Sequence, residues 1–224
     1  MENRQRELTG QKLWLVSLGS MLAVQNGYYV KELLLDEPDD EARINEGRVS
    51  LKRDWGIHDR ETLKDSLAFL DNGGHSRGYM DMARQWGHIH EEQCEKALAS
   101  IDDETYKSKV RLVNTHHMAL HNCGIYAWDA GRAAHLIRDA WYLGIITEEE
   151  EIWELLLQWG KKVQPQFTGW DHFGLSYAVG RAYWAVQNLS KPFCNNMYTT
   201  LRKITLDTNH PWNQLEWNLL LQDP

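Results

Sequence analysis

Two aromatic-rich segments built around Gly-Arg-Ala constrain the fold of this chain more than any other feature. Residues 127–133 read AWDAGRA, and residues 169–184 read GWDHFGLSYAVGRAYW. Both have helical periodicity, so each segment places an arginine on or near an apolar helix face. A charge on such a face is costly unless it is paired. We therefore expect the two helices to pack together, to cross near Gly131 and Gly180, and to enclose a polar centre.

The rest of the chain is also predicted to be helical. Helical patterns recur in six further ranges, which are 10–26, 60–72, 80–86, 91–100, 104–121 and 147–163. No alternating run of strand length is found, apart from a short stretch at residues 30–35. Eleven tryptophans and an apolar fraction of 42% supply a substantial core. These observations predict a single compact all-α domain of many helices with a Trp-rich core. N-terminal helices within residues 1–50 are expected to pack on a main helical domain formed by residues 51–224.

Three helix starts carry capping signals. Asp59 is the predicted N-cap of the helix over residues 60–72. Thr147 is followed three residues later by Glu150, which fits a capping box. Thr168 is followed at the same spacing by Asp171, so this acid is also a candidate for helix capping.

Charge and cysteine content argue against several classes of function. The net charge is −8 and the isoelectric point is 5.7, so a broad basic face for nucleic acid is not expected. The three cysteines, Cys94, Cys123 and Cys194, are odd in number and lack C-x-x-C spacing, which is typical of a reducing compartment. The apolar run at residues 13–24 is too short to span a membrane and fits a first core helix. We therefore expect a cytoplasmic protein without a membrane span.

An ordered series of short motifs extends over residues 50–220. In order, it comprises WGI at 55–57, DRETL at 59–63, GH at 74–75, AWDAGRA at 127–133, GxxTEE at 144–149, a W…GRxxW segment at 170–184 and a PW…W segment at 211–217. In this series the chain resembles the uncharacterised bacterial YbeU/YbeR-like family. It departs from the usual family pattern at Gly169, Asp171 and Glu216. The resemblance implies a shared fold and residue set, and no particular reaction.

The polar residues of the two Gly-Arg-Ala segments are candidates for a binding site. Asp129 and Arg132 are three residues apart, and Tyr177 and Arg181 are four apart, so each pair shares a helix face. One interpretation is a buried bridge between Asp129 and Arg181 that locks the crossing helices. The other is an open cleft where both arginines bind a carboxylate or phosphate bidentately. The residues expected to bind the ligand are Arg132, Arg181, Tyr177, Trp128 and Trp184.

Three residues are candidates for acid–base catalysis, and each has a structural alternative. Asp129 could act as an acid or base, or serve only as a buried ion-pair partner. His75 follows two glycines in a predicted loop, where it could transfer a proton or simply make a loop hydrogen bond. Asp171 could act in catalysis or cap its helix.

A metal site and a cofactor site are not expected. His117 and His121 have the i,i+4 spacing of a ligand pair, and Cys123 is close in sequence. No third ligand can be placed, and the chain has no H-E-x-x-H motif. A P-loop and a G-x-S-x-G elbow are also absent from the sequence.

Three functions remain open at the level of sequence. The first is a binding or interaction module whose Asp/Arg/Tyr centre holds a small anionic ligand or a segment of a protein partner. The second is an enzyme or toxin-type effector that acts on a nucleotide or another anionic substrate. The third is a purely structural polar core with partner contacts elsewhere. The oligomeric state cannot be inferred from these patterns.

Overall fold

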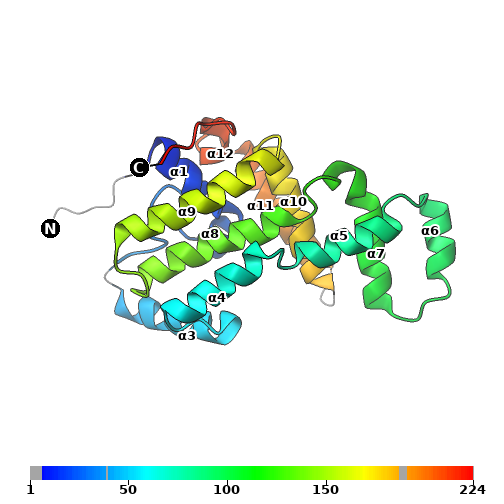
Figure 1. The fold of residues 1–224 in the computed structure, drawn as a ribbon, viewed down its shortest axis with the longest axis horizontal. Coiled ribbons are helices and arrows are strands. Elements are labelled where there is room, and N and C mark those ends of the chain that lie inside the picture. Colours follow the sequence, from blue (N-terminus) through cyan, green and yellow to red (C-terminus); the bar gives the residue numbers. More distant parts are fainter. Residues whose placement is uncertain (1–6, 39, 187–190, 224) are drawn as a thin grey trace.

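The computed structural model describes residues 7–38, 40–186 and 191–223, with only the backbone for residues 191–197 (Figure 1). Within these ranges the chain forms helices joined by turns and loops, and no strand is present. The predicted all-α class with a Trp-rich core is confirmed. No helix in the described ranges combines the length and apolar character needed to cross a membrane.

Helix α8 (Tyr126–Tyr142) is the central element of the fold. It is flanked by α9 (Glu149–Val163), α4 (Arg60–Asp71), α2 (Ser20–Asn26) and α10 (Trp170–Trp184), and Figure 1 shows α8 running between α9 and α4. Most of its side chains are buried, including the polar ones of Asp129, Arg132, His135 and Arg138. A helix buried on all sides needs partners for every polar group that it carries.

Helices α8 and α10 cross in close contact at the two glycines, as the sequence predicts. A Cβ atom on Gly180 would lie 2.3 Å from Cβ of Trp128, and one on Gly131 would lie 2.7 Å from the ring of Tyr177. Each glycine therefore accommodates an aromatic side chain of the opposite helix. The rings of Trp128 and Tyr177 meet edge to face at a centroid distance of 5.1 Å.

The tryptophan cluster joins the two ends of the chain. Trp14 of α1 (Gly10–Ser17) packs 5.2 Å from both Trp170 and Trp217, and Trp170 stacks on Trp212 of α12 (Pro211–Gln214). Two indole N–H groups of this cluster are satisfied by carbonyls from the other end of the chain: Trp14 donates to the carbonyl of Trp217, and Trp212 donates to that of Ser17. Helix α11 (Lys191–Leu206) connects this cluster to the end of α10.

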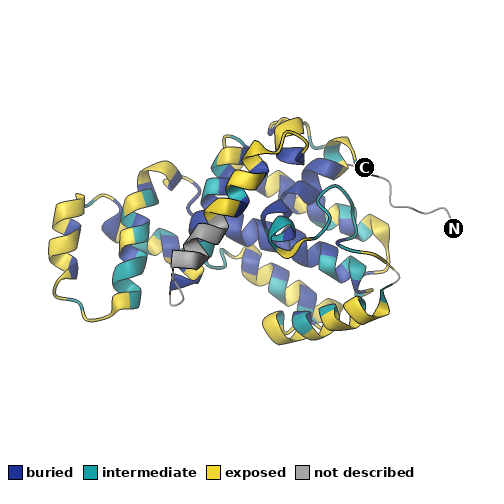
Figure 2. Ribbon diagram, turned by 180° about the vertical axis from the view of Figure 1, so that it is seen from behind, coloured by how far each residue is buried: buried dark blue, intermediate teal, exposed yellow. Residues whose placement is uncertain are grey.

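Three helices project from the main body as an arm. They are α5 (Ser76–Trp86), α6 (Glu91–Leu98) and α7 (Glu104–Leu120), and α5 continues from the loop that follows α4 (Figure 1). The arm has its own small core of Trp86, Cys94, Leu98 and Val110. Figure 2 shows that much of α6 and of α3 (Glu41–Trp55) is exposed, whereas buried residues concentrate around α8.

Some predicted helix boundaries are correct and others are not. Asp59 accepts a hydrogen bond from the Thr62 amide and forms a capping box, as predicted. The helix expected at residues 10–26 is divided into α1 and α2, because the backbone turns at Gly19 where it meets the backbone of His135. The caps predicted at Thr147 and Thr168 are wrong.

The N-cap positions of α9 and α10 lie one residue beyond the predicted threonines. They are Glu148 and Gly169, and neither helix has a side-chain cap hydrogen bond. Thr168 instead lies against His172, with its hydroxyl 3.3 Å from Nδ1 of that ring. The capping role predicted for Asp171 is therefore wrong.

Candidate functional site

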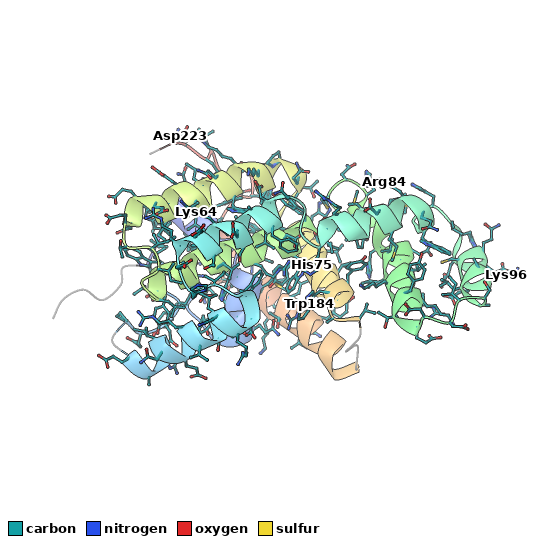
Figure 3. The ribbon with its side chains drawn as sticks, turned by 60° about the horizontal axis from the view of Figure 1, so that its bottom comes forward. Lys64, His75, Arg84, Lys96, Trp184 and Asp223 are labelled. Carbon is teal, nitrogen blue, oxygen red and sulfur yellow. The ribbon has the colours of Figure 1, made fainter. Side chains whose placement is uncertain are left out.

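A cavity of about 750 Å³ follows one face of α8. From α8 it is lined by Trp128, Arg132, His135 and Asp139, whose spacing of four, three and four residues marks a single helix face. Its other walls come from helices α2, α3, α4 and α10. Two loop residues, Tyr28 and His75, complete the lining. His75 and Trp184, which are labelled in Figure 3, both line this space. This volume is within the range of small-molecule sites.

A buried ion pair forms the base of the cavity. Nη2 of Arg132 lies 2.5 Å from Oδ1 of Asp129, and the two residues are 5% and 0% exposed. The backbone amides of His75 and Ser76 donate to the same carboxylate at 3.2 and 2.9 Å. Asp129 thereby ties the α4–α5 loop to α8. Gly74 is needed at this point, because a Cβ there would lie 2.6 Å from the carboxylate.

The same contacts select one tautomer for a neutral His75 ring. Nη2 of Arg132 donates to Nδ1 of His75 at 2.9 Å. A guanidinium nitrogen can only donate, so Nδ1 must be the acceptor and the neutral ring carries its proton on Nε2. The side chain of His75 is 29% exposed and lines the cavity. It therefore presents an imidazole held in one orientation to any bound molecule.

Two guanidinium groups stack on the indole rings at this end. The centre of the Arg132 guanidinium lies 4.3 Å from the Trp128 ring and 5.2 Å from the Trp55 ring. That of Arg181 lies 5.4 Å from Trp128 and 5.1 Å from Trp184. Burial lowers the pKa of both arginines. For Arg132, the nearby negative charge of Asp129 acts in the opposite direction and raises the pKa. Stacking on aromatic faces orients guanidinium groups and leaves their edges for planar anions.

The opposite end of the cavity is formed by a histidine and a carboxyl group. Nε2 of His135 lies 3.6 Å from Oδ2 of Asp139, and the His135 ring stacks on Tyr28 at 5.7 Å. Burial lowers the pKa of His135 to about 3, with a smaller effect from Arg138. Burial also raises the pKa of Asp139 to about 7, although Arg138 acts in the opposite direction. The His135 imidazole is therefore neutral at physiological pH, whereas the Asp139 carboxyl group has a pKa close to physiological pH.

Arg138 holds this end of the cavity in shape. The residue is 0% exposed, and its guanidinium donates to the backbone carbonyls of a single loop. The acceptors are Tyr29 at 2.7 Å, Glu32 at 2.8 Å, Leu33 at 3.1 Å and Leu34 at 3.3 Å. Burial lowers the pKa of Arg138 to about 10, so the group remains charged at neutral pH. Loop carbonyls that would otherwise be buried without partners are thereby satisfied.

Five of the residues predicted from the sequence line this cavity, and three do not. Arg132, Arg181, Trp128, Trp184 and His75 are brought together at one end. The bridge expected between Asp129 and Arg181 is replaced by the pair between Asp129 and Arg132, within α8 itself. The reason is geometric: the Asp129 carboxylate points toward the α4–α5 loop, from which it accepts two amide hydrogen bonds.

The other three predicted residues lie outside the cavity wall. Asp129 is fully buried beneath it, so it positions Arg132 and cannot meet a ligand in this conformation. Tyr177 is also fully buried, behind Trp128, and burial raises its pKa. Asp171 is exposed on the first turn of α10.

Several wall residues were not identified from the sequence. The most important are His135 and Asp139, which continue the face of α8 that begins with Trp128 and Arg132. A signal was present, because these polar residues recur at helical spacing on an otherwise apolar helix. Tyr28, Trp55 and Phe69 come from three separate elements, and no local pattern relates them to α8.

The cysteines and the histidine pair show no comparable arrangement. Cys94 and Cys123 are free thiols, whereas the Cys194 side chain lies outside the described residues. Sγ of Cys123 lies 3.4 Å from Nε2 of His172, but burial raises the thiol pKa to about 11, so it is not a thiolate at neutral pH. His117 packs edge to face on His88. Within the described part of the chain, no cluster of three potential metal ligands is found.

These features define an all-helical domain in which a buried Asp–Arg pair supports a cavity with aromatic, basic and acidic walls. The chain belongs to the family described as "Protein of unknown function (DUF1266)", which matches residues 50–217. It is 28% identical over 134 residues to "Uncharacterized protein YbeU" of Escherichia coli (strain K12), and 23% identical over 134 residues to "Uncharacterized protein YbeR" of the same organism. Each match covers 60% of this chain and 56% of the relative's length. No solved structure matches the chain.

Proposed function

We propose that this domain binds a small anionic ligand in the cavity along α8. The observation that carries the proposal is the placement of two guanidinium groups, those of Arg132 and Arg181, against the Trp128 ring at one end of the cavity. Guanidinium groups bind carboxylates and phosphates through pairs of parallel hydrogen bonds. The adjacent indoles provide a flat surface for an apolar or aromatic part of the same ligand.

The charge balance at this end supports an anion of low charge. The buried carboxylate of Asp129 offsets the positive charge of Arg132. Two further acids, Asp54 and Asp65, line the walls, although Asp54 is paired with Arg53 at 2.7 Å. A monocarboxylate or monophosphate therefore suits the site better than a polyanion.

The bond pattern of Arg132 is also compatible with a ligand. Its Nε donates to the carbonyl of Trp128, and its Nη2 donates to Asp129 and His75. Among the residues that the structure describes, none accepts a hydrogen bond from its Nη1. An incoming oxygen could accept from this nitrogen without breaking the pair with Asp129.

A thermal-shift screen at low salt tests the proposal. Phosphate, nucleoside monophosphates and aromatic carboxylates should raise the melting temperature of the wild type, because they bind the folded state. The effect should disappear in Arg181→Met. The matched control is Arg111→Met, which removes an exposed arginine of the arm that is paired with Glu95. If no anion stabilises the wild type at millimolar concentration, the proposal fails.

An enzyme that acts on such an anion is the second candidate. Its supporting observation is His75, whose orientation and tautomer are set by Arg132 at the edge of the cavity. The test is product formation from the stabilising anions, measured by chromatography. Turnover that is lost in His75→Gln while binding persists would establish an enzyme. Binding without turnover would establish a binding module.

A further inference from the structure

The cavity has a second polar end with the opposite hydrogen-bonding character. Arg132 and His135 are three residues apart on α8, and Asp139 is seven residues from Arg132. At a rise of 1.5 Å per residue, Arg132 and Asp139 are separated by about 10 Å along the helix axis. Donors therefore gather at one end of the cavity and a carboxyl group lies at the other.

His135 adds an acceptor to that far end. The residue is only 4% exposed, lines the cavity, and has Nε2 near Asp139. Its Nδ1 is buried, and among the described residues it has no hydrogen-bond partner. A neutral ring with Nε2–H toward the carboxylate leaves Nδ1 as an unsatisfied acceptor. A buried polar atom without a partner is uncommon and is often satisfied by a ligand or ordered water.

Resting on the ligand site proposed above, we propose that the cavity takes a zwitterion of tripeptide length, with its carboxylate at Arg132 and Arg181 and its ammonium at Asp139 and His135. Three extended residues span about 10 Å, which matches the separation of the two ends. The carboxylate accepts from the guanidinium groups, and the ammonium donates to the Asp139 carboxylate. Leu22, Leu51 and Phe69 add apolar surface to the lining for the central side chain.

The far end of the cavity favours a ligand ammonium group over an uncharged group. Asp139 is buried enough that its pKa is raised to about 7, and a cation beside it would restore the charged form. A nucleotide has no permanent cation at this distance from its phosphate. The acids Asp54 and Asp65 on the walls add to the preference for a positive group over further negative charge.

Isothermal titration of the full chain with three matched peptides tests the inference. The probes are Gly-Phe-Gly with free termini, its N-acetyl derivative and its C-terminal amide. The free peptide should bind the wild type about tenfold more tightly than either blocked form, because each block removes a charge-assisted contact. In Asp139→Asn the free and N-acetyl peptides should bind equally. In Arg181→Met the free and amide forms should bind equally.

The pH dependence provides a readout specific to the far end. The charged and titratable groups around Asp139 are His135, Arg138, Tyr28 and, beside Tyr28, Arg43 and Glu46. Of these protein groups only Asp139 should change charge between pH 5.5 and pH 7, where the peptide α-amino group, with an ordinary pKa of about 7.7–8.0, stays mostly protonated. Affinity for the free peptide should therefore rise over this interval while that for the N-acetyl form stays constant. Melting curves of each variant verify that it is folded.

The outcomes separate this inference from the proposed function. If the N-acetyl and free peptides bind the wild type equally, the zwitterion is ruled out and the anion site stands. If the amide binds as tightly as the acid, the anion site itself is overturned. If no peptide binds but phosphate or a nucleotide stabilises the protein, only the present inference fails. If neither peptides nor anions bind, both fail.

Discussion

Asp129 binds Arg132 one turn further along α8, and both side chains are almost completely buried. The same residue types at the same spacing recur in the arm, where Asp81 and Arg84 form an exposed pair on α5. The two pairs differ in environment, since Asp129 also accepts hydrogen bonds from two backbone amides of the α4–α5 loop. The chain therefore contains an internal comparison between a buried and an exposed ion pair.

Asp129→Asn should destabilise the protein by about 3–5 kcal/mol, because it leaves the buried Arg132 charge without its partner. Asp81→Asn, the exposed counterpart, should change stability by less than about 1 kcal/mol. Urea unfolding of both variants, followed by circular dichroism, measures the difference. Equal effects of the two substitutions would mean that the buried pair contributes no more than the surface pair.

Gly180→Ala should destabilise the contact between α8 and α10 by about 1–3 kcal/mol. The new Cβ would lie 2.3 Å from Cβ of Trp128 and 3.1 Å from that of Ile125, so one helix must move. Gly78→Ala on α5 is the control, because the Cβ there meets only the Tyr183 hydroxyl at 3.5 Å. That control should be neutral or stabilising by about 0.5–1 kcal/mol. An unchanged melting temperature in Gly180→Ala would contradict the close crossing.

The sequence predicts the helix pair well, because its signals are local. The spacing of Asp129 and Arg132 places them on one face, and the small residues near Gly131 and Gly180 indicate close approach. The partner of Asp129 could not be assigned in the same way. It depends on how the α4–α5 loop, with Gly74 in a positive-φ conformation, reaches α8.

The far end of the cavity could be inferred only in part, because the elements that bury His135 and Asp139 are distant from α8 in the sequence. Arg138 satisfies carbonyls of residues about a hundred positions earlier, and a sequence pattern carries no information about such a pairing. His135 and Asp139 have the spacing of an ordinary exposed i,i+4 pair. Only their burial gives them shifted pKa values, and that burial is set by α2, α3 and the intervening loop.

The stability difference between Asp139→Asn and the wild type should depend on pH. The pKa of Asp139 is raised to about 7 in the folded state, compared with about 3.9 in an unfolded chain. Between these values the unfolded state loses a proton that the folded state keeps, so this group lowers stability as pH rises from about 4 to about 7. The asparagine variant cannot ionise, so it should become progressively more stable than the wild type across this interval and remain so at pH 8.

His135 acts in the opposite direction, but it does so in both proteins. Its pKa is lowered to about 3, so it reduces stability as pH falls below about 6.5, and this contribution cancels in the difference. Chemical denaturation at pH 4.5, 6 and 8 measures the effect, with Asp81→Asn as the exposed control. A difference that is independent of pH would show that Asp139 ionises normally in the folded protein.

Arg138→Met should open the loop that closes the far end of the cavity. The substitution removes the charge-assisted hydrogen bonds to the carbonyls of Tyr29, Glu32, Leu33 and Leu34 and leaves those groups without their donors. Trypsin should then cleave after Lys31, within this loop, at least about tenfold faster than in the wild type, since even one such bond contributes about 1.5 kcal/mol or more. Mass spectrometry identifies and quantifies the cleavage.

Two comparisons separate local opening from a general loss of stability. Arg43→Met removes an exposed arginine that pairs with Asp36 of the same loop, and it should change cleavage after Lys31 only slightly. Cleavage after Lys96, in the exposed arm, should be equal in all three proteins if only the loop has opened. Parallel acceleration at Lys31 and Lys96 would instead mean that Arg138 stabilises the whole domain. Unchanged cleavage at Lys31 would mean that the loop keeps its conformation without Arg138, because its remaining contacts, such as the hydrogen bond from the Leu8 amide to the Lys31 carbonyl, are then sufficient.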